Sequence, residues 1–265
     1  MWIYDNTFIL IYVGAVSFLL GAVMGSFLNC AAYRIAHNES FIKGRSHCTS
    51  CGHSLSVPDL VPIFSYIFLK GKCRYCGAKL SVRYPITELV FALMSLGLVL
   101  EFGITLLCLR NFILICCLFC LSIVDIESYT IPNGCLIIPA AAWAAYLPFS
   151  GMEIKDMLLH VLAGFVFGAG LLAVSLVLDK IMKKETMGGG DIKLIAVVGL
   201  YFGFAGSLFA LIISCVLGLL TGALMKFIFK NQEKQIPFGP SISAAACFML
   251  YAGSGIVEWY VGLIS

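Results

Sequence analysis

Charged residues are scarce in this sequence: Asp, Glu, Lys and Arg together make up 12% of its 265 residues. Hydrophobic residues make up 61%, and the mean hydropathy is +1.00. Soluble globular domains carry about twice that share of charge, and disordered chains contain far fewer apolar residues. The composition excludes both classes and is typical of a protein that crosses a membrane several times.

Two further absences narrow the class. No internal repeat is recognisable, which argues against the inverted-repeat architecture of many transporters. The N-terminal segment lacks the basic n-region and the small-residue cleavage site of a signal peptide. We therefore expect the first apolar span to be retained in the mature protein.

The apolar residues form about eight runs that can be interpreted as membrane-spanning helices. The sixth run is short and directly follows a glycine run, as in a broken helix that lines a cavity. The sequence therefore predicts an all-α polytopic membrane protein with about eight transmembrane helices. The predicted spans are residues 7–33, 86–101, 104–124, 131–149, 157–178, 192–202, 204–229 and 238–264.

Small residues recur at four-residue spacing within these runs. Such spacing lets two helices approach closely, so packing is the expected role of these glycines. The pairs are Gly21/Gly25, Gly164/Gly168, Gly199/Gly203 and Gly218/Gly222.

The seventeen basic residues are unevenly distributed between the two sides of an eight-span arrangement. Fifteen fall on one side, and only Arg110 and Lys155 fall on the other. Because basic residues accumulate in cytosolic loops, the long first loop is predicted to be cytosolic and both termini to lie outside. This topology explains the basic loops without a nucleic-acid partner.

One polar insert interrupts the apolar spans and divides the chain into three expected parts. Residues 1–35 are predicted to form the first transmembrane helix. Residues 36–84 are predicted to form a small cytosolic loop, and residues 85–265 a seven-helix membrane core.

Two Cys-x-x-Cys pairs mark the insert. Cys48 and Cys51 form the first pair, Cys73 and Cys76 the second, and a glycine follows each pair. Four thiolates in two such pairs suit a tetrahedral, structural zinc ion. The alternatives are two disulfides or free thiols, although disulfides rarely persist in a reducing cytosol.

Two aspartates stand at the ends of apolar runs. Asp125 follows the third predicted span directly, and Asp191, 66 residues later, precedes the sixth, so the topology places both at the cytosolic face. If two such carboxyl groups meet, they share a proton; the ionised one can take a proton from water while the neutral one polarises a peptide carbonyl. The pair predicts an aspartic protease in or beside the bilayer. The alternative is that both aspartates cap helices.

Residues near these elements are weaker candidates for substrate positioning. Gly188, Gly189 and Gly190 allow positive φ and close backbone approach, so a substrate strand could lie against Asp191. Lys193 is interpreted first as a topology charge and second as a partner for a substrate carboxylate. Glu88, just inside the second span, is interpreted first as a helix cap and second as a site residue.

The motifs, taken in order, resemble those of the type IV prepilin peptidases, and the resemblance covers nearly the whole chain. The glycine–aspartate element alone is also similar in presenilin-like and archaeal preflagellin peptidases, whereas the full set of motifs in this order is highly specific. The motifs are Gly25-Ser26-Phe27-Leu28-Asn29, Tyr33-Arg34, the four cysteines, Arg83-Tyr84-Pro85-Ile86-Thr87-Glu88-Leu89, Asp125 with Ile131-Pro132-Asn133, Gly188-Gly189-Gly190-Asp191-Ile192-Lys193-Leu194, and Ile236-Pro237-Phe238-Gly239-Pro240.

The resemblance implies a bifunctional enzyme of the bacterial inner membrane. Members of this family remove the short basic leader of prepilins or type II secretion pseudopilins at the cytosolic face, and then methylate the new N-terminal amine with S-adenosyl-L-methionine. Carried over, Asp125 and Asp191 would be catalytic, the four cysteines would bind zinc, and both termini would be periplasmic. No motif marks the methyl-donor site, and the resemblance implies no particular oligomeric state.

Two other functions are compatible with the residues. In a proton-coupled transporter, the aspartates would relay protons and the cysteine loop would sense zinc. In an intramembrane aspartic protease of another kind, the same pair would cut other helical substrates. The missing repeat and the glycine run before Asp191 both count against the transporter.

Overall fold

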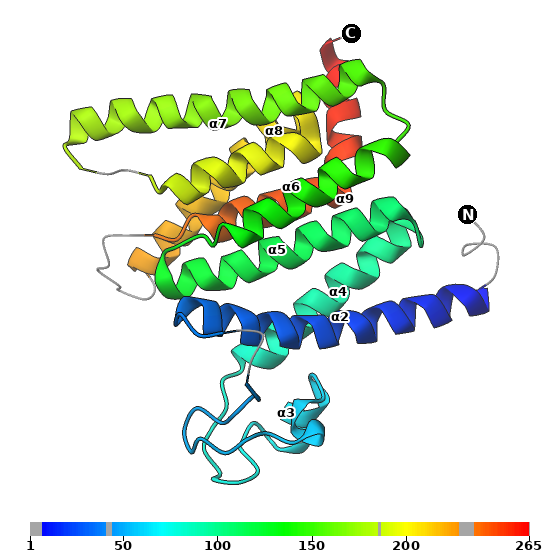
Figure 1. The fold of residues 1–265 in the computed structure, drawn as a ribbon, viewed down its shortest axis with the longest axis vertical. Coiled ribbons are helices and arrows are strands. Elements are labelled where there is room, and N and C mark those ends of the chain that lie inside the picture. The colour runs from blue at the N-terminus through cyan, green and yellow to red at the C-terminus, as the bar shows by residue number, and fades with distance from the viewer. Residues whose placement is uncertain (1–6, 41–43, 185–186, 228–235, 265) are drawn as a thin grey trace. The chain divides into compact units, whose positions relative to one another are not determined.

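The computed structural model describes residues 7–40, 44–184, 187–227 and 236–264 (Figure 1). Helices dominate, and the only extended structure in these ranges is two isolated bridges. The predicted all-α fold is therefore confirmed. The helices are α2 (Thr7–Ala36), η1 (Val57–Leu60), α3 (Phe64–Phe68), α4 (Arg83–Phe102), α5 (Leu106–Ser128), α6 (Gly134–Tyr146), η2 (Leu147–Phe149), α7 (Ile154–Met182), α8 (Gly189–Phe227) and α9 (Gly239–Ile264).

Six of the described helices are long and apolar enough to cross a membrane: α2, α4, α5, α7, α8 and α9. The predicted fourth span corresponds to the shorter helix α6 with the turn η2. Predicted spans six and seven both lie in α8, which is interrupted at Gly203 by non-helical backbone angles of φ 63° and ψ −164°. The prediction of about eight helical segments is thus confirmed. Lys43, Phe229, Lys230 and Lys234, which entered the topology argument or the span bounds, lie outside the described residues.

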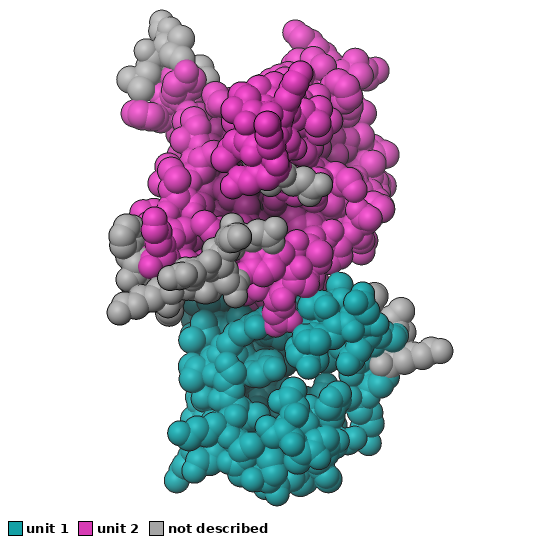
Figure 2. All heavy atoms as spheres, turned by 90° about the vertical axis from the view of Figure 1, so that its left-hand side faces the viewer, with its two compact units in different colours: residues 1–108 teal, residues 109–265 magenta. Residues whose placement is uncertain are grey.

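The chain divides into two compact units, residues 1–108 and residues 109–265 (Figure 2). In the first unit, α2 packs along α4 at positions where α2 has no side chain. A β-carbon on Gly21 would lie 2.6 Å from the Ser95 β-carbon, and one on Gly25 would lie 3.0 Å from that of Phe91. These contacts confirm that the first glycine pair serves helix packing.

In the second unit, α8 contacts α6, α7 and α9. Glycine again allows close helix packing, here between α7 and α8: a β-carbon on Gly164 would lie 2.7 Å from the carbonyl oxygen of Ala196 in α8. Another on Gly218 would lie 2.6 Å from the ring of Phe238, which directly precedes α9. Close packing of this kind holds the N-terminal ends of α8 and α9 in place.

Candidate active site and metal centre

Asp125 lies in the last turn of α5 and is 5% exposed. The backbone N–H of Gly239 donates a hydrogen bond of 2.9 Å to its Oδ2 atom. Gly239 is the first residue of α9, where backbone N–H groups have no partner within the helix. Asp125 therefore caps a different helix from its own, and the positive end of the α9 dipole favours negative charge on this carboxylate.

Gly239 has a role that the sequence reasoning did not assign to it. A β-carbon at this position would lie 2.8 Å from Oδ2 and 3.2 Å from Cγ of Asp125. Any residue other than glycine must therefore displace the carboxylate or the start of α9. The sequence signal was a glycine at the beginning of a predicted span, but its partner lies 114 residues away in the chain.

Asp191 lies in the first turn of α8, two residues after the helix begins at Gly189. The residue is half-buried, yet its Oδ1 atom is buried and has no hydrogen-bond partner. The carboxyl groups of Asp191 and Asp125 are close enough for the charge of one to act on the other. Both predicted aspartates thus lie in the second unit at helix ends, Asp125 in the last turn of α5 and Asp191 in the first turn of α8, and the catalytic role of the pair stays a prediction.

The three glycines before Asp191 differ in their surroundings. A β-carbon on Gly190 would lie 2.8 Å from the Ile131 β-carbon, whereas one on Gly189 would meet nothing within 4 Å. One on Gly188 would lie 3.4 Å from Asp191 Oδ2, an ordinary contact. None of the three has a positive φ, so the left-handed backbone that glycine allows is not used here, and the approach of a substrate strand stays a prediction. The close approach is made at Gly190, against the loop that precedes α6.

Lys193 is exposed, and its Nζ atom donates a hydrogen bond of 3.2 Å to Oδ1 of Asn133. Asn133 belongs to the same loop as Ile131, directly before α6. The start of α8 therefore contacts this loop twice, through Gly190 and through Lys193. Binding of a substrate carboxylate by Lys193 stays a prediction.

The polar insert contains two loops of the same design, 25 residues apart. In each, the amide of the first cysteine donates to the carbonyl oxygen five residues later, at 2.9 Å and 2.8 Å. Each loop turns through the glycine after its second cysteine, with φ of 72° at Gly52 and 71° at Gly77. These glycines do need the left-handed region. The sequence reasoning noted both glycines but did not recognise a local repeat.

The Sγ atoms of Cys48, Cys51, Cys73 and Cys76 all lie within 4.8 Å of one another, and none is in a disulfide. Four sulfurs that surround one zinc ion at roughly 2.3 Å stand about 3.8 Å apart, so this cluster fits one tetrahedral metal ion. Hydrogen bonds from the backbone amides of Cys51 and Ser50 lower the pKa of the Cys48 thiol to about 6. This shift favours the thiolate form at Cys48, whereas burial and the neighbouring thiols raise the pKa of Cys76 to about 11.

A carboxylate braces the metal loops from the side. Arg74 Nε lies 2.6 Å from Asp59 Oδ1, and the Tyr75 hydroxyl donates to Asp59 Oδ2 at 3.0 Å. Hydrogen bonds from Ser56 lower the pKa of Asp59 to about 2. Because Arg74 and Tyr75 stand between the two cysteines of the second pair, Asp59 ties the η1 turn to that loop.

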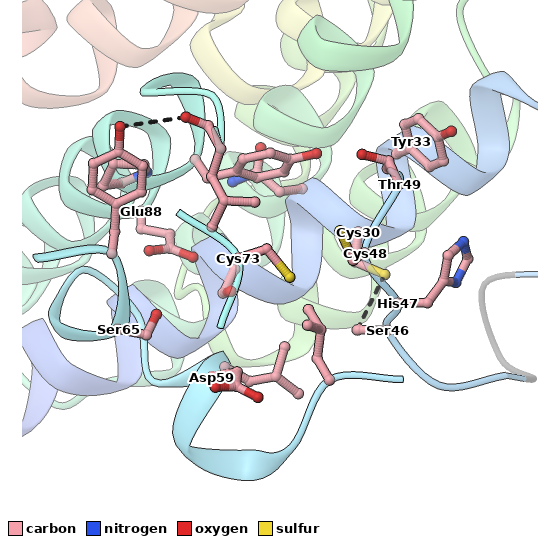
Figure 3. A pocket seen from close by; sticks show the side chains of 18 of the residues that line it. Cys30, Tyr33, Ser46, His47, Cys48, Thr49, Asp59, Ser65, Cys73 and Glu88 are labelled. Atoms are coloured by element: carbon pink, nitrogen blue, oxygen red, sulfur yellow. Dashed lines mark hydrogen bonds between the residues drawn. The ribbon is translucent and has the colours of Figure 1, made fainter. Parts of the chain in front are cut away.

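Glu88 lies in the second turn of α4 and is 8% exposed. Its Oε2 atom accepts a hydrogen bond of 2.8 Å from the backbone N–H of Ile63, and the Ser26 hydroxyl also bonds to the carboxylate. At the start of α4 the Ser81 hydroxyl accepts a hydrogen bond of 3.2 Å from the N–H of Arg83, whereas Glu88 bonds to residues outside its own helix, so the first interpretation of Glu88 as a helix cap is wrong. The residue lines a cavity of the first unit, beside the metal loops (Figure 3).

Two family models match the chain. The Bacterial Peptidase A24 N-terminal domain matches residues 19–102, and the Type IV leader peptidase family matches residues 112–223. The first match falls within the first compact unit and includes the four cysteines and Glu88. The second falls within the second unit and includes Asp125 and Asp191.

Several known bacterial proteins are similar to the chain over most of its length. A prepilin leader peptidase/N-methyltransferase of Bacillus subtilis is 33% identical over 249 residues, which cover 93% of this chain and 97% of that protein. A type 4 prepilin-like proteins leader peptide-processing enzyme of Escherichia coli is 30% identical over 254 residues, 87% of this chain and 91% of that protein. No solved structure shows significant similarity to the chain.

Proposed function

Because this chain belongs to the type IV leader peptidase family, we propose that Asp125 and Asp191 are its catalytic pair. The protein is a multi-pass protein of the bacterial inner membrane, a membrane aspartic endopeptidase that removes the leader of prepilins, and an N-methyltransferase. The observation that supports the catalytic assignment is that both carboxylates lie in the second unit, within range of each other's charge, and that Asp191 Oδ1 is buried without a partner.

The two aspartates have unequal surroundings, and this inequality suggests their roles. Asp125 receives the Gly239 N–H and lies at the N-terminus of α9, which stabilises its negative charge. We assign the role of base to Asp125, which takes a proton from the attacking water. Asp191 then holds the shared proton and polarises the scissile carbonyl of the leader. Water attacks directly, so no acyl-enzyme forms.

The cysteine cluster is proposed to hold a structural zinc ion. Cys48, Cys51, Cys73 and Cys76 would hold the ion through four thiolates and leave no position for water, so the metal would take no part in leader cleavage. Its binding stabilises an insert that has few buried apolar side chains of its own. The insert, residues 36–84, separates the first helix from the proposed seven-helix core. The proposed topology places this insert in the cytosol and both termini in the periplasm.

The methyl donor is proposed to be S-adenosyl-L-methionine, which when bound supplies an electrophilic methyl group on a sulfonium. The N-terminal amine freed by cleavage must lose its proton to act as a nucleophile. That nitrogen would accept the methyl group, the sulfur would keep the electron pair of its bond to the methyl carbon, and the nitrogen would release a second proton to water. The transporter and the other intramembrane protease are not favoured, because the similar proteins are prepilin-processing enzymes.

Replacement of either catalytic aspartate tests the assignment. Asp125→Asn and Asp191→Asn should each lower the rate of prepilin cleavage by at least roughly a hundredfold, the lower end of what a general acid or base contributes. The exposed Asp156, at the start of α7, provides a matched control, and Asp156→Asn should cleave at the wild-type rate. Full processing by either catalytic-site variant in purified form would refute the assignment.

A further inference from the structure

The turn η1 and the short helix α3 present large apolar side chains on the outside of the insert. Phe68 is the most exposed of those in α3, at 79%. The other side of α3 faces inward, where Ser65 lines the cavity beside the metal loops (Figure 3). This is the reverse of a helix on a soluble domain, whose apolar side faces its own core. The exposed residues, here called the apolar patch, are Val57, Leu60, Val61, Phe64, Ile67 and Phe68.

The helix α3 lies beside α2 and the start of α4 and not beyond their ends (Figure 1). The N–H of Ile63, directly before α3, donates a hydrogen bond of 2.8 Å to Glu88 in the second turn of α4. Glu88 packs against Gly25 of α2, where a β-carbon would lie 3.1 Å from the Glu88 Cα atom. Gly25 precedes the end of α2 at Ala36 by 11 residues, or about 16 Å of helix. The insert therefore folds back alongside the apolar part of α2.

The backbone of this segment is hydrogen-bonded, as a position at the edge of the apolar layer requires. The Glu88 carboxylate accepts from the N–H of Ile63. The N–H of Ser65 donates to the carbonyl oxygen of Val61 at 3.0 Å, and that of Ile67 to the carbonyl oxygen of Ile63 at 3.2 Å. An unpaired amide is costly where water does not reach it. Glu88 thus supplies an acceptor from outside the segment, in place of water.

Basic side chains stand next to the apolar patch. Between residues 44 and 83 there are six Lys and Arg residues and a single acid, Asp59, which already pairs with Arg74. Lys70 lies two residues after α3, and Lys72 stands directly opposite Lys79 in an isolated antiparallel bridge. These three lysines are exposed, and none forms a salt bridge within the part of the chain that the structure describes. Because like charges opposite one another repel, an anionic surface would stabilise them.

We propose that the apolar patch inserts into the boundary between the headgroups and the acyl chains of the bilayer, where Lys70, Lys72 and Lys79 bind anionic lipid phosphates. The inference rests on the proposed cytosolic placement of the insert, which makes the contacted leaflet the cytosolic one. Apolar side chains beside basic ones are typical of an element that lies in the membrane interface, and anionic lipids attract juxtamembrane lysines. Phe27 of α2 and Ile86 of α4 are exposed as well, so the patch extends a lipid-facing surface.

Photo-cross-linking of the full-length protein in lipid nanodiscs tests this contact directly. A benzophenone side chain in place of Phe68 should label lipid acyl chains. The same group in place of Ser50, an exposed position of the first metal loop, should label no lipid. If the group at position 68 labels prepilin or another part of the chain and no lipid, while prepilin is still cleaved, the lipid contact is overturned and the leader peptidase activity stands.

Trypsin cleavage after Lys70 measures how often the segment leaves the bilayer, because the protease cuts only the lifted form. Phe64→Ser combined with Phe68→Ser should raise the cleavage rate in nanodiscs by at least roughly tenfold, since two large apolar side chains no longer hold the segment in lipid. Ile104→Ser, at a position 73% exposed in the loop after α4, should leave that rate unchanged. Equal rates in the wild type and the Phe64→Ser/Phe68→Ser variant overturn the proposal.

The lipid charge and the leaflet are tested separately. Wild-type cleavage after Lys70 should be several-fold slower in nanodiscs that contain phosphatidylglycerol than in phosphatidylcholine alone, and Lys72→Gln with Lys79→Gln should remove this difference. A wild-type rate that does not respond to phosphatidylglycerol overturns the role of the lysines. In membrane vesicles, trypsin should cut the Phe64→Ser/Phe68→Ser variant only when the vesicles are inside-out. Cutting only in right-side-out vesicles overturns the cytosolic placement and leaves the lipid contact standing.

Discussion

Replacing Gly239 by alanine should slow leader cleavage without unfolding the protein. Gly239 lies at the first position of α9, and its N–H donates to Asp125 Oδ2 at 2.9 Å. The added β-carbon would lie 2.8 Å from that oxygen, whereas ordinary contacts begin at 3.4 Å. The carboxylate must therefore retreat by about 0.6 Å, a shift that matters for a group that has to position water.

The expected loss follows from the bond that is broken. A hydrogen bond to a charged group contributes roughly 1.5–3 kcal/mol. If the full amount is lost in the transition state, kcat/KM falls roughly tenfold to a hundredfold. Because Gly239 acts by positioning Asp125 and does not bind the leader, the fall should appear in kcat with little change in KM.

The assay compares cleavage of a purified prepilin by the wild type, Gly239→Ala and Gly255→Ala. Gly255 lies in the same helix, and a β-carbon there would meet nothing within 4 Å, so its variant should cleave at the wild-type rate. Methylation of pre-cleaved pilin should be unchanged in both variants. The expected fall is at least roughly tenfold, so cleavage by Gly239→Ala within about twofold of the wild-type rate would refute the role given to this amide.

Three further perturbations give distinct results. Gly190→Ala should reduce cleavage because its β-carbon would meet Ile131, while Gly189→Ala should be tolerated; equal rates for the two would contradict the packing argument. Chelation of the metal should make the insert sensitive to limited proteolysis, and an unchanged digestion pattern would contradict a structural metal. The Asp59→Asn variant should release the metal to a chelator several-fold faster at neutral pH. The pKa of Asp59 is about 2 in the folded protein and about 3.9 in the unfolded chain, so the carboxylate stabilises the insert fully at pH values above about 3.9. This stabilisation is lost as the pH falls through the folded pKa. Unaltered release would count against the Asp59–Arg74 brace.

Much of the membrane architecture could be predicted because it depends on local composition. Apolar runs mark the helices, and the short sixth run before Gly203 corresponds to the break in α8. Glycines at four-residue spacing mark close helix contacts, as at Gly21 and Gly164. The aspartate pair could be proposed because charge is so rare near membrane spans that each carboxylate requires a reason.

Three of the errors and omissions involve partners that are distant in the sequence. Glu88 resembles a cap when only its own helix is considered, but contacts with Ser26 and Ile63 bury it against a cavity. The glycines before Asp191 could supply either unusual backbone angles or close approach, and only the structure shows that Gly190 supplies space for a side chain 59 residues earlier in the chain, Ile131. The Gly239–Asp125 bond joins two helix ends whose pairing no local pattern reveals.

Intact-mass measurement of two substrates tests the central claim most directly. Purified Asp191→Asn, incubated with S-adenosylmethionine, should leave a full-length prepilin uncut and should add a single methyl group, about 14 Da, to a pilin cleaved beforehand. The wild type should do both. The variant should lose cleavage alone, because leader cleavage depends on the aspartates of the second unit and methyl transfer does not. A cut prepilin in the Asp191→Asn reaction would contradict the catalytic assignment of this aspartate.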